Sequence, residues 1–170
     1  MRAEELRSLQ APLKERYRED PGAAEVTLTA SGNLDEGISC SVRTGAAVAA
    51  AGLHPATGGD GSLLCSGDML LEALVACAGV TLRAVSTSLE IPVESGTVTA
   101  DGDLDFRGTL GVGDDAPVGF RSIRLRFDLV SAASREQLET LVRLTERYCV
   151  VLQTLTTAPE LTTSFGSSAI

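Results

Sequence analysis

Residues 66–85 read Ser66-Gly67-Asp68-Met69-Leu70-Leu71-Glu72-Ala73-Leu74-Val75-Ala76-Cys77-Ala78-Gly79-Val80-Thr81-Leu82-Arg83-Ala84-Val85. Small and aliphatic residues occupy nearly every turn on all sides, which is typical of a helix buried in a core. The most apolar window, Met69–Val85, carries Glu72 and Arg83 and falls short of the length needed to cross a bilayer. We therefore expect a core helix that ends before Ile91-Pro92, because the residue preceding a proline disfavours helical torsion angles.

The composition indicates an ordinary globular domain with an acidic surface. The chain has 170 residues, of which 44% are hydrophobic and 22% charged, and 14 Lys and Arg against 23 Asp and Glu give a net charge of -9. This charge opposes nucleic acid and anionic membrane surfaces, so we expect neither as a partner. Residues 1–20 lack the apolar segment of a signal peptide, and the expected location is cytoplasmic.

The N-terminal segment, residues 1–20, is expected to be separate from a single domain over residues 21–170. Its apolar side chains recur at helical spacing over residues 2–19, with charged residues on the remaining faces. The pattern predicts an amphipathic helix containing Pro12. This helix either packs on its own domain or holds a partner subunit.

The remaining pattern predicts an α+β fold with helices packed against mainly antiparallel sheet. Apolar runs, alternation and turn residues predict strands over residues 24–31, 38–43, 46–53, 98–106, 123–129 and 161–165. Turn chemistry falls at Gly32-Asn33 and at residues 35–37. Ser66 is expected to cap the central helix, and Ser134 caps a second long helix that runs into residues 149–155.

Four cysteines are present, and no two of them form a C-x-x-C pair: Cys40, Cys65, Cys77 and Cys149. This spacing favours neither a disulfide scaffold nor a zinc ribbon, and fits a thiol-retaining protein. A metal site formed by Cys65 with His54, or by the strand aspartates 101, 103 and 105, is a minor alternative. The aspartates are more simply interpreted as a solvated strand face, because no loop organises them as ligands.

The chain resembles the OsmC/Ohr family, the osmotically inducible and organic hydroperoxide resistance proteins. Leu70-Leu71 through Cys77 and Thr81-Leu82 are similar to that family's L-L-x-A-L-x-A-C-x-x-x-T-L helix. Cys149-Val150-Val151 with Thr154-Leu155 is similar to its C-P-V-x-x-[TA]-L segment. The resemblance covers about residues 24–166, and its two motifs are fairly specific when found together in this order.

The resemblance implies a thiol peroxidase in which Cys77 attacks an organic hydroperoxide and Cys149 resolves the resulting sulfenic acid as a disulfide. It also implies an external dithiol reductant of the lipoyl type, no bound cofactor and no metal. Family members form intertwined homodimers in which sheets from both chains enclose the long helices. The chemistry requires a thiol of low pKa beside a resolving thiol in an apolar pocket.

The sequence departs from the family pattern in two places. Val150 stands where the pattern has proline, and the first hairpin lacks the arginine that the family places near the attacking thiol. Asp68 is our choice for the acidic partner of Cys77, with Glu72 as the alternative. The cations left open are Arg43, Arg83, Arg121 and Arg124.

Two further alternatives follow from these departures. Cys65 precedes the central helix and is a second candidate for the resolving thiol. The missing arginine also favours an alternative function, a non-catalytic dimer of the same fold that binds or stabilises a partner.

Overall fold

The computed structural model describes residues 2–25, 27, 31–34, 39–44, 47–112 and 114–166. The helices are α1 (Ala3–Glu19), α2 (Ser66–Leu89), α3 (Phe106–Thr109), α4 (Arg135–Tyr148) and α5 (Val150–Thr156), and short 3-10 turns occupy Pro21–Ala24 and Pro55–Thr57. The strands are β1 (Ser31–Leu34), β2 (Ser39–Thr44), β3 (Ala47–Gly52), β4 (Leu64–Cys65), β5 (Ser95–Asp103) and β6 (Ser122–Val130). The predicted mixture of helices and strands is confirmed.

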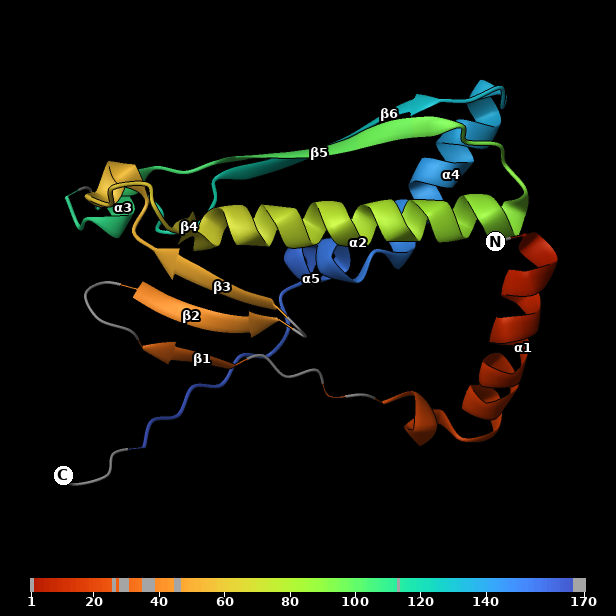
Figure 1. Ribbon diagram of the computed structural model, residues 1–170, viewed down its shortest axis with the longest axis horizontal. Helices are drawn as coiled ribbons and strands as arrows, with labels where there is room; N and C mark the ends of the chain where they lie inside the picture. The colour runs from red at the N-terminus through yellow and green to blue at the C-terminus, as the bar shows by residue number, and fades with distance from the viewer. Residues whose placement is uncertain are drawn as a thin grey trace.

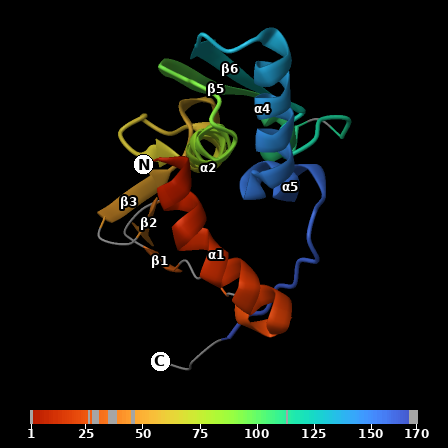
Figure 2. The ribbon, with the colours of Figure 1, turned by 90° about the vertical axis from the view of Figure 1, so that its right-hand side faces the viewer.

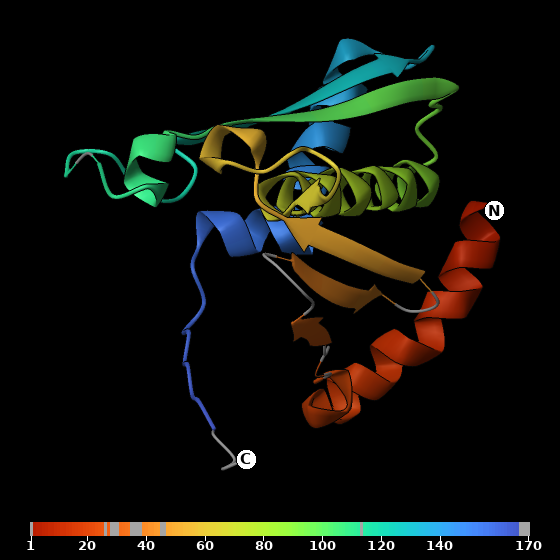
Figure 3. The ribbon, with the colours of Figure 1, turned by 60° about the vertical axis from the view of Figure 1, so that its left-hand side comes forward.

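Helix α2 lies between two groups of strands (Figure 1, Figure 3). On one side β1, β2 and β3 pair antiparallel in sequence order, and β4 adds to β3 in parallel. On the other side β5 and β6 form an antiparallel ribbon in which Ser95 faces Val130 and Asp103 faces Ser122. Seen along α2, helix α4 flanks it beside the β5–β6 ribbon (Figure 2).

The core follows one stripe of α2. Leu74, Ala78, Leu82 and Ser86 are buried and recur at every fourth residue, so they lie on one face of the helix. Leu74 and Ala78 form a cluster with Cys149, while Leu82 packs with Leu141 of α4 in a second cluster. Strand β6 covers both clusters with its inward residues, because successive side chains of a strand point to opposite faces.

In the single chain, α2 is not buried on all sides. Leu70, Val80 and Leu89 are 38%, 72% and 46% exposed, so much of the apolar surface of α2 is uncovered in the single chain. The helix has 24 residues and ends at Leu89, before Ile91-Pro92 as predicted, and by length and composition it is long and apolar enough to span a membrane. Its buried stripe nevertheless packs against β6 and α4, as a core helix does.

Helices α1 and α4 form where the sequence predicted them. Helix α1 continues through Pro12 and contacts α2 near the end of that helix. At the start of α4, the backbone N–H of Gln137 donates to the Ser134 hydroxyl at 3.2 Å. The Ser134 N–H donates in return to the Gln137 side chain at 2.9 Å, which completes a capping box.

Several predicted boundaries were wrong. Gly32-Asn33 lies within β1 rather than in a turn, whereas residues 35–37 lie outside the described residues. Cys65 rather than Ser66 is the residue preceding α2, and its side chain makes no capping hydrogen bond. Strand β5 ends at Asp103, and Phe106 begins the short helix α3 because the Asp105 carboxylate accepts a hydrogen bond from the Arg107 N–H.

The C-terminal part also differs from the prediction. The second long helix stops at Tyr148, and Cys149 is extended, with φ -74° and ψ 106°, before α5 begins. Residues 157–166 extend from α5 without regular secondary structure, so the predicted closing strand over residues 161–165 does not form in the single chain (Figure 3). Leu161 and Phe165 within it are 84% and 97% exposed.

Candidate active site

Helices α2 and α5 bring Cys77 and Cys149 together, although the two cysteines are far apart in the sequence. Cys149 is fully buried with Leu74 and Ala78, and the partly buried Cys77 packs against this cluster. The two side chains are neighbours, because Cys77 packs against the cluster that contains Cys149, and both are free thiols. The structure therefore places an accessible thiol next to a buried one.

The break between α4 and α5 positions the second thiol. The extended backbone of Cys149 ends α4, and its N–H still donates to the Thr145 carbonyl at 2.9 Å. Its own carbonyl accepts the N–H of Gln153 at 2.9 Å, which starts α5. The first N–H groups of α5 have no partner within the helix, and those of Val150 and Val151 act to lower the pKa of the Cys77 thiol.

These contacts shift the pKa of Cys77 downward. Burial is the largest single influence and acts to raise the pKa of the Cys77 thiol. It is outweighed by hydrogen bonds from the Val151 N–H, the Cys149 thiol, the Val150 N–H and the Thr81 hydroxyl. All four contacts favour the thiolate, so Cys77 is the more readily ionised sulfur of the pair.

The pKa of Cys149 moves in the opposite direction. Burial is the largest influence and raises the pKa of the Cys149 thiol, whereas a hydrogen bond from the Leu152 N–H lowers it. The neighbouring Cys77 raises the pKa of Cys149 further, through a hydrogen bond and through its charge. Cys149 therefore stays a thiol and donates its proton toward the Cys77 sulfur. A more readily ionised sulfur beside a less readily ionised one is the arrangement that an attacking and a resolving cysteine require.

Asp68 is not brought to Cys77 by the described structure. It lies in the first turn of α2, nine positions before Cys77, and its side chain is exposed. At 1.5 Å per residue this corresponds to about 13 Å along the helix axis. Glu72 is exposed as well and lies five positions before Cys77, off its face of the helix. The role of Asp68 stays a prediction without support from this geometry.

Three of the four candidate arginines have other partners. The side chain of Arg43 lies outside the described residues, and Arg83 donates to the Val93 carbonyl at 2.6 Å. Arg124 pairs with Asp103 across the β5–β6 ribbon, donating to Oδ1 at 2.9 Å. Hydrogen bonds from Arg124, the largest influence, and from Ser122, the second largest, hold the pKa of the Asp103 carboxyl well below its usual range.

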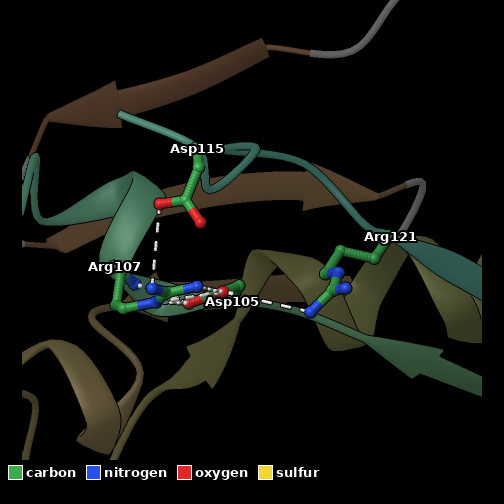
Figure 4. A network of polar contacts seen from close by, with 4 residues as sticks. All are labelled: Asp105, Arg107, Asp115 and Arg121. Atoms are coloured by element: carbon green, nitrogen blue, oxygen red, sulfur yellow. Dashed lines mark hydrogen bonds and ion pairs between the residues drawn. The ribbon is translucent and has the colours of Figure 1, made fainter. Parts of the chain in front are cut away.

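Arg121 belongs to a second ionic group at the end of the ribbon (Figure 4). Arg107 donates a hydrogen bond to the Asp105 carboxylate at 2.6 Å. Arg121 lies 4.0 Å from the same carboxylate, and Asp115 lies 3.8 Å from the Arg107 guanidinium. Hydrogen bonds from the side chain and then the backbone of Arg107 are the main reasons that the pKa of Asp105 falls to about 2. The aspartates of this region thus act as partners for arginine.

Cys65 lies in a different place from the Cys77–Cys149 pair. It borders a cavity of about 360 Å³ together with His54 and Phe106, whose rings stack at 4.7 Å. It precedes α2 and is twelve positions from Cys77, which is about 18 Å along the helix axis. The position of Cys65 thus gives no support to a resolving role.

Sequence reasoning missed two contributors to the site. Thr81 falls within the family motif, and its spacing of one helical turn from Cys77 was a signal that it shares the face of that residue. The N–H groups of α5 had no comparable signal, because the break at Cys149 depends on backbone torsion angles rather than on a particular residue type.

Fold and site together define a mixed helix and strand protein with a partly buried thiol next to a buried one. A family model described as OsmC-like protein matches residues 59–164, and the chain belongs to this family. The predicted family resemblance is thereby confirmed. A comparison with curated proteins found no match.

Solved structures share the fold at low sequence identity. An OsmC-like protein from Mycoplasma pneumoniae has a TM-score of 0.67 and 16% identity, over 79% of this chain and 90% of that one. An organic hydroperoxide resistance protein from Elizabethkingia anophelis has a TM-score of 0.64 and 15% identity, over 79% of this chain and 91% of that one. An organic hydroperoxide resistance protein OsmC from Legionella pneumophila has a TM-score of 0.62 and 16% identity, over 79% of this chain and 92% of that one.

Proposed function

We propose that this protein is a cysteine-based peroxidase that reduces organic hydroperoxides, and in addition hydrogen peroxide. The observation that carries the proposal is the packing of Cys77 on α2 against Cys149 at the start of α5, where the pKa of Cys77 is lowered and that of Cys149 is raised. Membership of the OsmC-like family, which includes organic hydroperoxide resistance proteins among its structural relatives, supports the same reaction class.

In the first step the Cys77 thiolate attacks the terminal oxygen of the hydroperoxide. An S–O bond forms as the O–O bond breaks, so that sulfur is oxidised to sulfenic acid and the peroxide is reduced to an alkoxide. The alkoxide leaves as alcohol after taking a proton, for which the Cys149 thiol is the adjacent donor. This transfer leaves Cys149 as a thiolate.

In the second step the Cys149 thiolate attacks the Cys77 sulfur. An S–S bond forms, the S–O bond breaks and water leaves after protonation. A dithiol of the lipoyl type then restores both thiols by two exchange steps and is itself oxidised to a disulfide. No bound cofactor or metal takes part in this scheme.

We also propose that the working unit is a cytoplasmic homodimer that binds neither nucleic acid nor membranes. In this dimer, antiparallel sheets of both chains would enclose the long helices. The exposed apolar residues of α2 and of the extended tail, including Val80, Leu161 and Phe165, support a second copy as their partner.

The proposal is tested by consumption of cumene hydroperoxide with a dithiol as reductant. Cys77→Ser should abolish turnover. Cys149→Ser should allow one turnover and leave an oxidised Cys77 that a sulfenic acid probe labels. Full turnover by Cys149→Ser, with a reductant that needs a resolving cysteine, would contradict the role of Cys149.

A second candidate function is a non-catalytic OsmC-like dimer that binds or stabilises a partner. The positions of Asp68 and of the candidate arginines favour it, because the described contacts of Cys77 include neither a carboxylate nor a guanidinium. This function predicts no turnover and no loss of free thiols after one equivalent of peroxide.

A further inference from the structure

A cavity of about 560 Å³ lies where α1, α2 and α4 meet. Its walls are mainly apolar, with Leu6 from α1, Val85 from α2 and Leu144 from α4. Polar groups converge on it from Thr81, Tyr148 and Lys14. An apolar cavity with a few directed polar groups is the usual form of a small-molecule site.

One wall of this cavity lies one helical turn from Cys77. Thr81 lines the cavity and follows Cys77 by four positions on α2, so the two residues share a face of that helix, and Tyr148 is the residue immediately before Cys149. Ala84 and Ser88 continue the lining along α2 at helical spacing from Thr81. A molecule that fills the cavity therefore has one end at Thr81, one helical turn from Cys77, and its body along α2.

The outer wall belongs to α1, which lies outside the region that matches the family model. Ala3 is buried at 8% exposure, and Arg7 pairs with Glu90 at the end of α2 at 3.5 Å. These contacts hold the first half of α1 against α2 (Figure 2). Leu6, Gln10 and Lys14 then face the cavity from successive turns.

Lys14 is the one charged residue among those that line the cavity in the described structure. Its ammonium group favours an anionic ligand, even though the chain as a whole carries a net charge of -9. We propose that α1 completes the substrate site and that Lys14 selects hydroperoxides with a carboxylate at the end remote from the O–O bond. This inference rests on the peroxidase function proposed above.

The test compares cumene hydroperoxide with the same molecule carrying a para-carboxylate. In Lys14→Gln, kcat/KM for the carboxylate should fall about 2- to 5-fold, as expected for an exposed ionic contact, while that for the neutral substrate stays unchanged. Lys14→Arg should restore the preference. The matched control is Arg18→Gln, which removes the same charge from α1 at a position that does not line the cavity. Equal effects on both substrates, or the same loss in Arg18→Gln, would overturn the inference.

Binding of the product alcohols separates this inference from the peroxidase proposal. Calorimetry with 2-phenyl-2-propanol and its para-carboxylate needs no turnover. Tighter binding of the carboxylate that Lys14→Gln weakens would support the anionic site, even if the protein proves to have no peroxidase activity. Turnover without this difference, or binding of neither alcohol, would overturn the site and leave the peroxidase proposal standing.

Discussion

At the scale of single residues, the site depends on an unequal pair of thiols. Cys77 and Cys149 are chemically identical groups, yet their pKa values move in opposite directions because different donors surround them. The Cys77 sulfur accepts hydrogen bonds from α5, Thr81 and Cys149, whereas Cys149 is enclosed by apolar side chains. The roles of attacking and resolving cysteine therefore follow from the surroundings rather than from the residue type.

Thr81→Val should raise the pKa of Cys77, because it removes one donor that stabilises the thiolate. Only the thiolate form of Cys77 is alkylated, so the alkylation rate falls when the pH drops below the pKa of Cys77. Because this pKa is lowered, the rate should stay high below the usual thiol pKa. In Thr81→Val the fall in rate should occur at higher pH. Alkylation by iodoacetamide, followed for the Cys77 peptide by mass spectrometry, measures this shift.

Thr81→Ser is the matched control for this experiment. It keeps the hydroxyl and should retain the pH profile of the natural protein. An unchanged profile in Thr81→Val would show that the hydroxyl does not stabilise the thiolate.

Asp68→Asn should leave peroxidase kcat/KM unchanged within about twofold, because an exposed charge beyond the Debye length of about 8 Å is largely screened. The position of Asp68 in the first turn of α2 is the basis of this expectation. Steady-state kinetics with cumene hydroperoxide provide the measurement. A much larger loss would restore Asp68 to the catalytic role that the sequence pattern favoured.

The sequence motifs predicted the two cysteines because each lies in a distinctive local pattern. They did not predict the partners of Asp103 and Asp105, which a strand pattern presents simply as exposed charges. Those partners arise from the pairing of β5 with β6 and from the turn at α3, which set the positions of Arg124 and Arg107. Such contacts depend on register and turn geometry, which residue alternation alone does not specify.

At the scale of elements, the stripe of α2 connects stability to the site. Leu74 is fully buried against Cys149 and Ala78. Leu74→Ala should lower the free energy of unfolding by about 2–5 kcal/mol, because it removes buried methyl groups and leaves a cavity. Urea unfolding measures the loss.

Val118→Ala is the comparison variant, since Val118 is 68% exposed. Its free energy of unfolding should change by about 0.5 kcal/mol or less. Similar losses in the two variants would contradict the position of Leu74 in the core.

Long periodic elements were predictable and element ends were not. Helices α1 and α4 and strand β6 each repeat one apolar pattern over several turns or residues, so local sequence suffices to find them. The break at Cys149 and the start of α3 at Phe106 each depend on a few torsion angles and hydrogen bonds. No periodic signal marks such positions.

At the scale of the whole molecule, the single chain leaves a large apolar surface uncovered. The outward side of α2 includes Val80 at 72% exposure, and the extended tail presents Leu161 and Phe165. The tail segment over residues 161–165 has the composition expected of a strand, but no neighbouring strand pairs with it among the residues that the structure describes. A strand needs such a neighbour for its backbone hydrogen bonds, and a second copy would provide one.

The protein should therefore have twice the 17.6 kDa mass of one chain in solution. Replacing Leu161 and Phe165 together by aspartate should shift it toward monomer, because buried carboxylates would have to lose their hydration. Light scattering coupled to size-exclusion chromatography measures the mass. A natural protein with the mass of one chain at all concentrations would contradict the dimer.

The most direct measurement is disulfide mapping of the natural protein after one equivalent of cumene hydroperoxide. We expect two thiols to be lost together and peptide mass spectrometry to find Cys77 joined to Cys149, with both thiols recovered after dithiol treatment. Unchanged Cys77, or a disulfide that pairs it with Cys40 or Cys65 instead, would contradict the pairing of Cys77 with Cys149 in catalysis.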